Sequence, residues 1–244
     1  MIWRPTRGSF AGAFAVLLFG CLLTHAQSTN VTGRVQFVGD NAPKKNKSSV
    51  VVWLDSLDPA AVRPASQVDS SATPRLVQKD KRFDPHILVV PVGSAVEFPN
   101  HDPFFHNVFS LFEGKRFDLG LYEAGTTRLV HFDRVGVSYI FCNIHPEMSA
   151  VVIALKTPYF GVSDALGRIS IGGVPPGRYE MQVWAEGASP ETLKTLTHEV
   201  RISETDHTLG AIHVTQDTPL APHKNKYGRD YDAPGTDYPP AEPR

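Results

Sequence analysis

The 244-residue sequence has little sulfur and almost no net charge. It contains two cysteines and three methionines, and its 24 basic side chains nearly balance 25 acidic ones, for a formal net charge of −1. This balance gives no basis for nucleic-acid binding, so any partner must be recognised through a local patch. Apolar residues with a period of 3.6 over ten or more positions are also missing, which argues against long amphipathic helices.

The first 26 residues have the pattern of a secretory signal peptide. A positively charged start precedes an almost uncharged apolar run from Phe10 to Leu23, and Thr24-His25-Ala26 resembles a cleavage site with small residues. We therefore expect a secreted or periplasmic protein of a bacterial envelope, without a membrane span in the mature chain. Two alternatives stay open: retention of the segment as a membrane anchor, and lipoprotein anchoring at Cys21.

Removal of residues 1–26 leaves Cys142 as the single cysteine, together with two methionines, Met148 and Met181. A lone thiol in an oxidising compartment cannot form an intramolecular disulfide and is open to oxidation unless it is buried or ligated. A buried structural cysteine is one interpretation. The residues that follow Cys142 favour a ligand.

Residues 141–148 place a thiolate, an imidazole and a thioether on one short loop, in the order Cys142, His145 and Met148. His106 lies upstream in another segment that alternates like a strand. Two histidines, one cysteine and a weakly held methionine form the ligand set of a blue-copper electron-transfer site. Zinc is the alternative metal, although it has little use for a thioether. A catalytic Cys–His pair is the enzymatic alternative.

Two neighbours of these residues are expected to support the site without binding the metal. Pro146 would stiffen the loop, and Asn107 would act as a hydrogen-bond donor near the thiolate. His86, His101 and His131 are candidate ligands of a second site, but exposed or hydrogen-bonded histidines are the plainer interpretation.

Aromatic residues beside and beyond the loop have open roles. Phe104 and Phe105 precede His106, where they could form an apolar rim for an electron-transfer partner or belong to the core. Trp53 and Trp184 alternate with apolar neighbours and are expected in the core of one β-module, formed by residues 31–55 plus 157–215.

The pattern elsewhere predicts an all-β fold, because short alternating segments are separated by turn residues. The continuous apolar run from Val50 to Leu54 is typical of a strand covered on both faces. Residues 56–75 form a long connection that suggests a domain boundary. Residues 216–244, rich in proline and charge, are expected to be a disordered tail. Other strands are expected at 31–37, 87–92, 95–98, 106–112, 127–132, 137–141, 150–155, 169–171, 179–184, 198–202 and 209–214.

Residues 76–156 resemble a cupredoxin, a Greek-key β-sandwich that binds one type 1 copper ion. The resemblance lies in Phe83–Val90, Gly93, Val96–Asn100, His106–Val108 and the loop with Cys142, His145 and Met148. It implies that His106, Cys142 and His145 are the equatorial copper ligands and that Met148 is the weak axial ligand. The loop is similar to that of amicyanin, and the arrangement also resembles bacterial methylamine-utilization or plastocyanin-like proteins. The implied function is that of a non-enzymatic electron carrier with an unidentified redox protein partner.

Residues 161–184 resemble a carboxypeptidase regulatory-like module, a transthyretin-like β-sandwich grouped with carbohydrate-binding-like folds. We expect a split module, residues 31–55 plus 157–215, into which the copper domain is inserted. In the alternative, residues 31–55 belong to the cupredoxin, which would leave the module with an exposed edge. Two further functions stay open: copper storage, delivery or sensing without electron transfer, and an envelope binding module that contacts glycan or protein.

Overall fold

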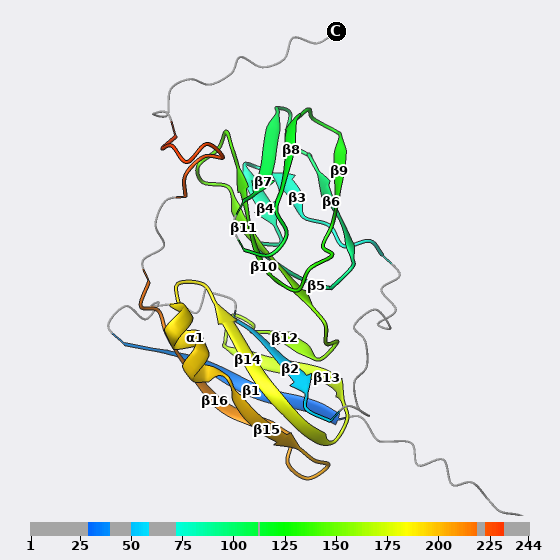
Figure 1. Cartoon of the computed structure of the whole chain (residues 1–244), viewed down its shortest axis with the longest axis vertical. Coiled ribbons are helices and arrows are strands. Elements are labelled where there is room, and N and C mark those ends of the chain that lie inside the picture. The colour runs from blue at the N-terminus through cyan, green and yellow to red at the C-terminus, as the bar shows by residue number, and fades with distance from the viewer. Residues whose placement is uncertain (1–28, 40–49, 59–71, 112, 219–222, 232–244) are drawn as a thin grey trace, which may run out of the picture.

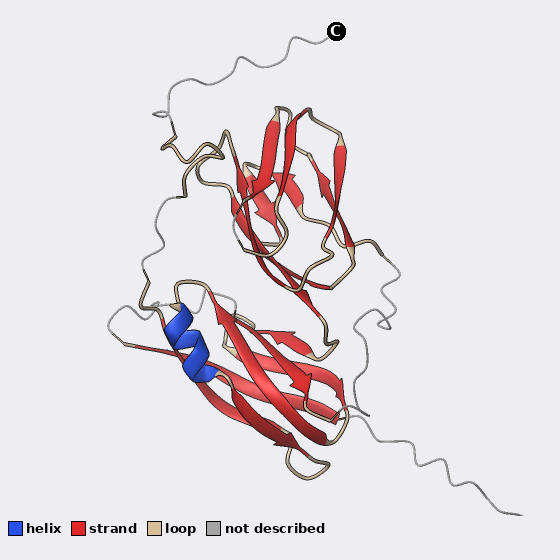
Figure 2. Cartoon of the chain, in the orientation of Figure 1, coloured by secondary structure: helices blue, strands red, loops and turns tan. Residues whose placement is uncertain are grey.

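The computed structural model describes residues 29–39, 50–58, 72–111, 113–218 and 223–231. The predicted signal peptide and most of the 56–75 connection lie outside these residues. Figure 1 shows two groups of strands, one above the other, and Figure 2 shows that the described chain is almost entirely strand, with one short helix. The predicted all-β fold class is confirmed. No helix in the described part of the chain is long and apolar enough to cross a membrane.

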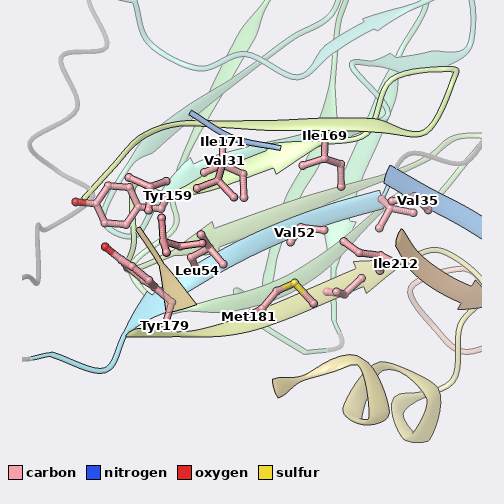
Figure 3. Packing of buried hydrophobic residues seen from close by; sticks show 14 of the residues in the cluster. Val31, Val35, Val52, Leu54, Tyr159, Ile169, Ile171, Tyr179, Met181 and Ile212 are labelled. Carbon is pink, nitrogen blue, oxygen red and sulfur yellow. The ribbon is translucent and has the colours of Figure 1, made fainter. Parts of the chain in front are cut away.

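The lower group is a sandwich of a three-stranded and a four-stranded sheet (Figure 1). Alternating residues of both sheets meet in one core, where Val31 and Val35 face Leu54 and Met181 (Figure 3). The strand order of the three-stranded sheet is β13 (Arg168–Val174), β1 (Thr29–Val38), β16 (Thr208–Thr215). The strand order of the four-stranded sheet is β12 (Phe160–Val162), β2 (Val50–Ser56), β14 (Gly177–Ala185), β15 (His198–Ile202).

The upper group has its own core, which includes Phe98, Phe132 and Ile140 together with Cys142 and Met148. Its largest sheet has five strands, and two pairs of strands accompany it. The five-stranded order is β5 (Ile87–Pro91), β11 (Ser149–Leu155), β10 (Gly136–Cys142), β7 (His106–Ser110), β8 (Phe117–Tyr122); the pairs are β6 (Ala95–Pro99) with β9 (Thr127–His131), and β3 (Val77–Lys79) with β4 (Arg82–Asp84).

The lower sandwich is built from two separate stretches of sequence. β1 pairs antiparallel with β13 and parallel with β16, and β2 pairs antiparallel with β12 and β14. All strands of the upper group, β3 to β11, lie between β2 and β12 in the sequence. The upper group is therefore attached to the lower sandwich at both of its chain ends.

A third hydrophobic cluster joins the two groups. Successive residues of β11 alternate between cores: Val152 belongs to the upper core, while Val151 and Ile153 pack with Val51 of β2 and Trp184 of β14. Both β2 and β11 are therefore covered on both faces, and the prediction for Val50–Leu54 is confirmed. Trp184, which was expected in the core of its own module, packs instead at this junction and is 3% exposed.

The structure adds short elements that the sequence patterns do not predict. β3, β4 and β12 have three residues each, too few to show an alternation. The helix α1 (Pro190–Leu196) has seven residues, so it has no visible period either. Its start does carry a local signal, because Ser189 caps the helix by accepting a hydrogen bond from Thr192 N and proline occupies the first turn.

Part of the expected disordered tail is ordered. Residues 223–231 form a turn in which Gly228 N donates to Asn225 O at 2.9 Å, and they contact the upper group. The prediction of disorder over 216–244 is wrong for this stretch. Its composition has no apolar period, and side-chain hydrogen bonds and ring stacking hold it instead.

Candidate metal centre

The predicted ligands gather where β7 begins and β10 ends. His106 is the first residue of β7 and Cys142 the last of β10, and these strands pair antiparallel with Cys142 opposite Val108. His145 and Met148 follow on the connection from β10 to β11. This connection is closed by hydrogen bonds from Met148 N to His145 O (3.1 Å) and from Cys142 N to Met148 O (3.2 Å). Proline at the second position of such a turn fits its backbone geometry.

Three donor atoms converge at this point. Cys142 Sγ lies 3.6 Å from His106 Nδ1 and 3.5 Å from His145 Nδ1, and the two nitrogens are 3.2 Å apart. Within the described residues, these three side chains are the group whose ligand atoms could hold one metal ion. His106 and Cys142 are fully buried, and so is Met148, which packs in the same core as Cys142.

A buried carboxylate fixes the orientation of His106. Asp102 Oδ2 lies 2.9 Å from His106 Nε2, and the carboxylate also accepts from Asp80 N (2.6 Å) and Lys81 N (3.1 Å). Asp80 and Lys81 both have a φ of +54°, so the turn between β3 and β4 directs two successive N–H groups at Asp102. The carboxylate only accepts, so the Nε2 of His106 carries the proton and the lone pair of Nδ1 faces Cys142.

Burial sets the protonation states of the ligands. It raises the pKa of the Cys142 thiol, although backbone N–H groups of Asn107, Ile144 and His145 donate to the sulfur and oppose this effect. Burial lowers the pKa of His106, and burial together with the neighbouring His106 lowers the pKa of His145 to about 4. Both imidazoles are thus neutral near neutral pH, as metal ligation requires, and the N–H groups are placed to stabilise a thiolate.

Asn107 supports the site through its backbone, because its N–H donates to the Cys142 sulfur and no such role falls to its side chain. Its backbone carbonyl accepts from Asn143 N at 2.8 Å, so its backbone holds the ligand loop. Its side chain is buried and donates to Asp118 Oδ1 at 2.7 Å, away from the thiolate. Pro146, the other predicted support, is exposed at the tip of the loop.

The two phenylalanines before His106 divide between the two interpretations. The Phe104 ring centroid lies 5.4 Å from both the His106 and His145 rings, so it covers the imidazoles. Phe105 is 44% exposed. Phe104 therefore belongs to the lining of the site, and Phe105 faces solvent beside it.

The other candidate histidines do not join this group. His101 and His131 are exposed. His86 Nε2 lies 3.1 Å from Glu186 Oε1, and His86 Nδ1 lies 3.1 Å from Ser149 O. Because Glu186 directly follows β14, His86 connects the upper group to the lower sandwich. Asp102 is the functional residue that the sequence reasoning missed. A carboxylate four positions before a ligand histidine was its only local signal.

No family model and no curated protein matched the sequence. Among solved structures, the chain is similar to a purple cupredoxin from Nitrosopumilus maritimus (23% identity, 34% of this chain and 99% of that one, TM-score 0.31). It is also similar to the reduced Cu(I) form of an amicyanin point mutant (20% identity, 43% of this chain and 98% of that one, TM-score 0.33). A third similarity is to a Cu-containing nitrite reductase from Thermus scotoductus (22% identity, 50% of this chain, TM-score 0.33). The chain covers only 28% of that enzyme. These TM-scores are below 0.5, so the function of this chain has to be argued from the geometry of its own site.

Proposed function

We propose that this protein binds one copper ion and serves as a one-electron carrier. His106, Cys142 and His145 would hold the ion, with Met148 as a weak fourth ligand. The observation that carries this proposal is the triangle of donor atoms with edges of 3.2, 3.5 and 3.6 Å. The point equidistant from all three atoms is about 2 Å from each, close to ordinary metal–nitrogen and metal–sulfur bond lengths.

The donor set also suits a redox ion. Bound copper supplies a one-electron couple, in which imidazoles favour Cu(II) while thiolate and thioether favour Cu(I). The chain contributes rigidity, because two ligands sit at strand ends and the loop carrying the others is closed by backbone hydrogen bonds. It also excludes water, since His106, Cys142 and Met148 are fully buried. A site that changes little between oxidation states is what an electron carrier, rather than an enzyme, requires.

Loading the purified protein with Cu(II) tests this function. We expect an intense visible thiolate-to-copper band that is lost in Cys142→Ser. His101→Ala is the matched control, because it removes an exposed histidine of the upper group of strands that is not one of the proposed ligands, and it should keep the band. A colourless protein that takes up zinc in preference to copper contradicts the proposal.

Copper storage or delivery is the second candidate, and the half-buried His145 favours it by leaving one ligand near the surface. The rate of electron self-exchange separates the two functions. A carrier exchanges electrons rapidly with a second copy, whereas a storage protein exchanges slowly and passes Cu(I) to a chelating partner.

We also propose the setting in which the site works. Secretion to a bacterial envelope rests on residues 1–26. The division into an inserted copper domain, residues 76–156, and a surrounding carboxypeptidase regulatory-like module, 31–55 plus 157–215, is supported by the pairing of β1 with β13 and β16 and of β2 with β12 and β14. The exposed Phe105 beside the site suits contact with a redox protein partner. Glycan or envelope contact through the surrounding module is a separate proposal, testable by pull-down.

A further inference from the structure

Residues 223–231, here called the C-terminal strap, lie against the strand end that carries the cysteine ligand (Figure 1). The Tyr231 hydroxyl donates to the backbone carbonyl of Cys142 at 2.6 Å. These two residues are 89 positions apart in the sequence. The contact is made to the backbone of the ligand residue, so it leaves the sulfur free to bind a metal.

The strap contacts the residue after the ligand as well. Lys226 N donates to Asn143 Oδ1 at 2.9 Å. The Lys226 ammonium group lies 2.8 Å from Asp118 Oδ2, while the other oxygen of Asp118 accepts from Asn107. This hydrogen-bonded chain runs from the strap to the residue beside His106. The ion pair is only partly exposed, with Lys226 at 18% and Asp118 at 37%.

The residue before the ligand is covered by a ring of the strap. The His223 ring stacks on Phe141, with centroids 4.2 Å apart and an angle of 26°. His223 Nδ1 also lies 3.1 Å from the Tyr231 hydroxyl, so the two rings support each other. Three consecutive residues, 141 to 143, are thus each held by a different part of the strap.

The strap has an internal structure that presents these groups together. The side-chain oxygen of Asn225 accepts from Tyr227 N and from Arg229 N, both at 3.0 Å. Asn225 N also donates to Arg229 O at 2.9 Å. Such a closed turn costs less entropy on docking than a freely draped segment, because its shape is fixed by its own hydrogen bonds.

We propose that the C-terminal strap is a positioning element of the metal centre, which holds the end of β10 in place and slows the release of bound metal. The inference rests on the proposed copper function. The ligand loop reaches solvent at Pro146 and Glu147, so contacts within the loop leave one side open. The strap holds the other end of the loop, at residues 141–143, from residues far along the chain. Tyr231 is the positioning residue with the most direct contact.

Hydrogen exchange of the full-length, metal-free protein tests the positioning role. Tyr231→Phe removes one hydrogen bond and keeps the ring. We expect amide exchange at Asn143 and Met148 to accelerate about 5- to 10-fold, the effect of losing a single hydrogen bond on a local opening equilibrium. The amide of Val151 in β11 donates to His86 O, away from the strap, and its exchange rate should not change. Tyr227→Phe is the matched control, because Tyr227 belongs to the strap and is 71% exposed.

Withdrawal of Cu(I) by an excess of bicinchoninate gives the second readout. Tyr231→Phe should release copper about 5- to 10-fold faster than the wild type, and Tyr227→Phe should release it at the wild-type rate. Unchanged loop exchange, or unchanged release from a variant that binds copper, overturns the proposal. A protein that binds no copper contradicts the proposed function instead, and the exchange measurement then decides the role of the strap alone.

Discussion

Replacing Asp102 by asparagine tests whether one buried carboxylate holds His106 ready for a metal. The Asp102 side chain is 4% exposed and accepts three hydrogen bonds, from Asp80 N, Lys81 N and His106 Nε2. Asparagine has nearly the same shape but replaces one acceptor oxygen by an NH₂ donor. The variant therefore changes hydrogen bonding and charge while it leaves the packing almost unaltered.

The size of the effect follows from the contacts of the two carboxylate oxygens. The amide oxygen keeps the most bonds when it takes the place of Oδ2 and accepts from Lys81 N and His106 Nε2, so that the new NH₂ group faces the N–H of Asp80. Hydrogen bonds to a charged acceptor contribute about 1.5 to 3 kcal/mol each, so the loss of one costs about 1.5 to 3 kcal/mol, and the two that remain are weaker because the acceptor is no longer charged. The weaker bond to the neutral amide also fixes the proton on Nε2 of His106 less firmly, and with it the lone pair of Nδ1 that faces Cys142. We expect metal affinity to fall about 10- to 100-fold, as is typical when a supporting partner of a ligand is removed.

Urea denaturation of the metal-free protein, followed by circular dichroism, measures the first effect, and a competition titration with a copper chelator measures the second. The control is Asp80→Asn, an exposed residue of the same turn whose positive φ asparagine tolerates. The reasoning is refuted if Asp102→Asn loses less than about 0.5 kcal/mol and binds copper as tightly as the wild type.

Three other substitutions test different parts of the structure. Met148→Leu nearly preserves core volume, so it should cost under about 1.5 kcal/mol and keep copper bound with a shifted visible band; complete loss of copper contradicts a weak axial role. Trp184→Ala should lower the free energy of unfolding by about 3 to 5 kcal/mol, measured by urea denaturation. An unchanged urea midpoint would contradict the packing of Trp184 between the two groups of strands. Glu186 raises the pKa of His86, so this pair stabilises the fold below the pKa of the unfolded state and loses its effect as pH rises through the raised value. His86→Gln should therefore lower stability at about pH 5, by less than about 1 kcal/mol because the pair is partly exposed, and leave it unchanged at about pH 9.

Local patterns predicted the parts of the fold that depend on neighbouring residues. The run Val50–Leu54 indicated a strand covered on both faces, and β2 packs against two separate clusters. The apolar residues near 150–155 likewise belong to a strand, β11, whose faces meet different cores. The strands β3 and β4 escaped prediction because three residues cannot establish a period. The packing of Trp184 at the junction depends on β11, which is distant in sequence.

The same distinction explains what could be said of the site. Cys142, His145 and Met148 share one loop, so their spacing was visible in the sequence, and the structure brings the donor atoms of Cys142 and His145 to within 3.5 Å. The support of the loop was not visible. Asp102 is held by a turn about 20 residues away, and Tyr231 reaches Cys142 across 89 residues. Neither contact follows a periodic pattern, because each depends on how distant segments pack.

The most direct test of the copper proposal is metal analysis, together with a visible absorption spectrum, of protein purified from the cells that naturally make it. The proposal predicts one copper ion per chain and an intense band from the thiolate of Cys142, bleached by reductant and restored by oxidant. Stoichiometric zinc in a colourless protein, or copper whose spectrum is unchanged by Cys142→Ser, would contradict it.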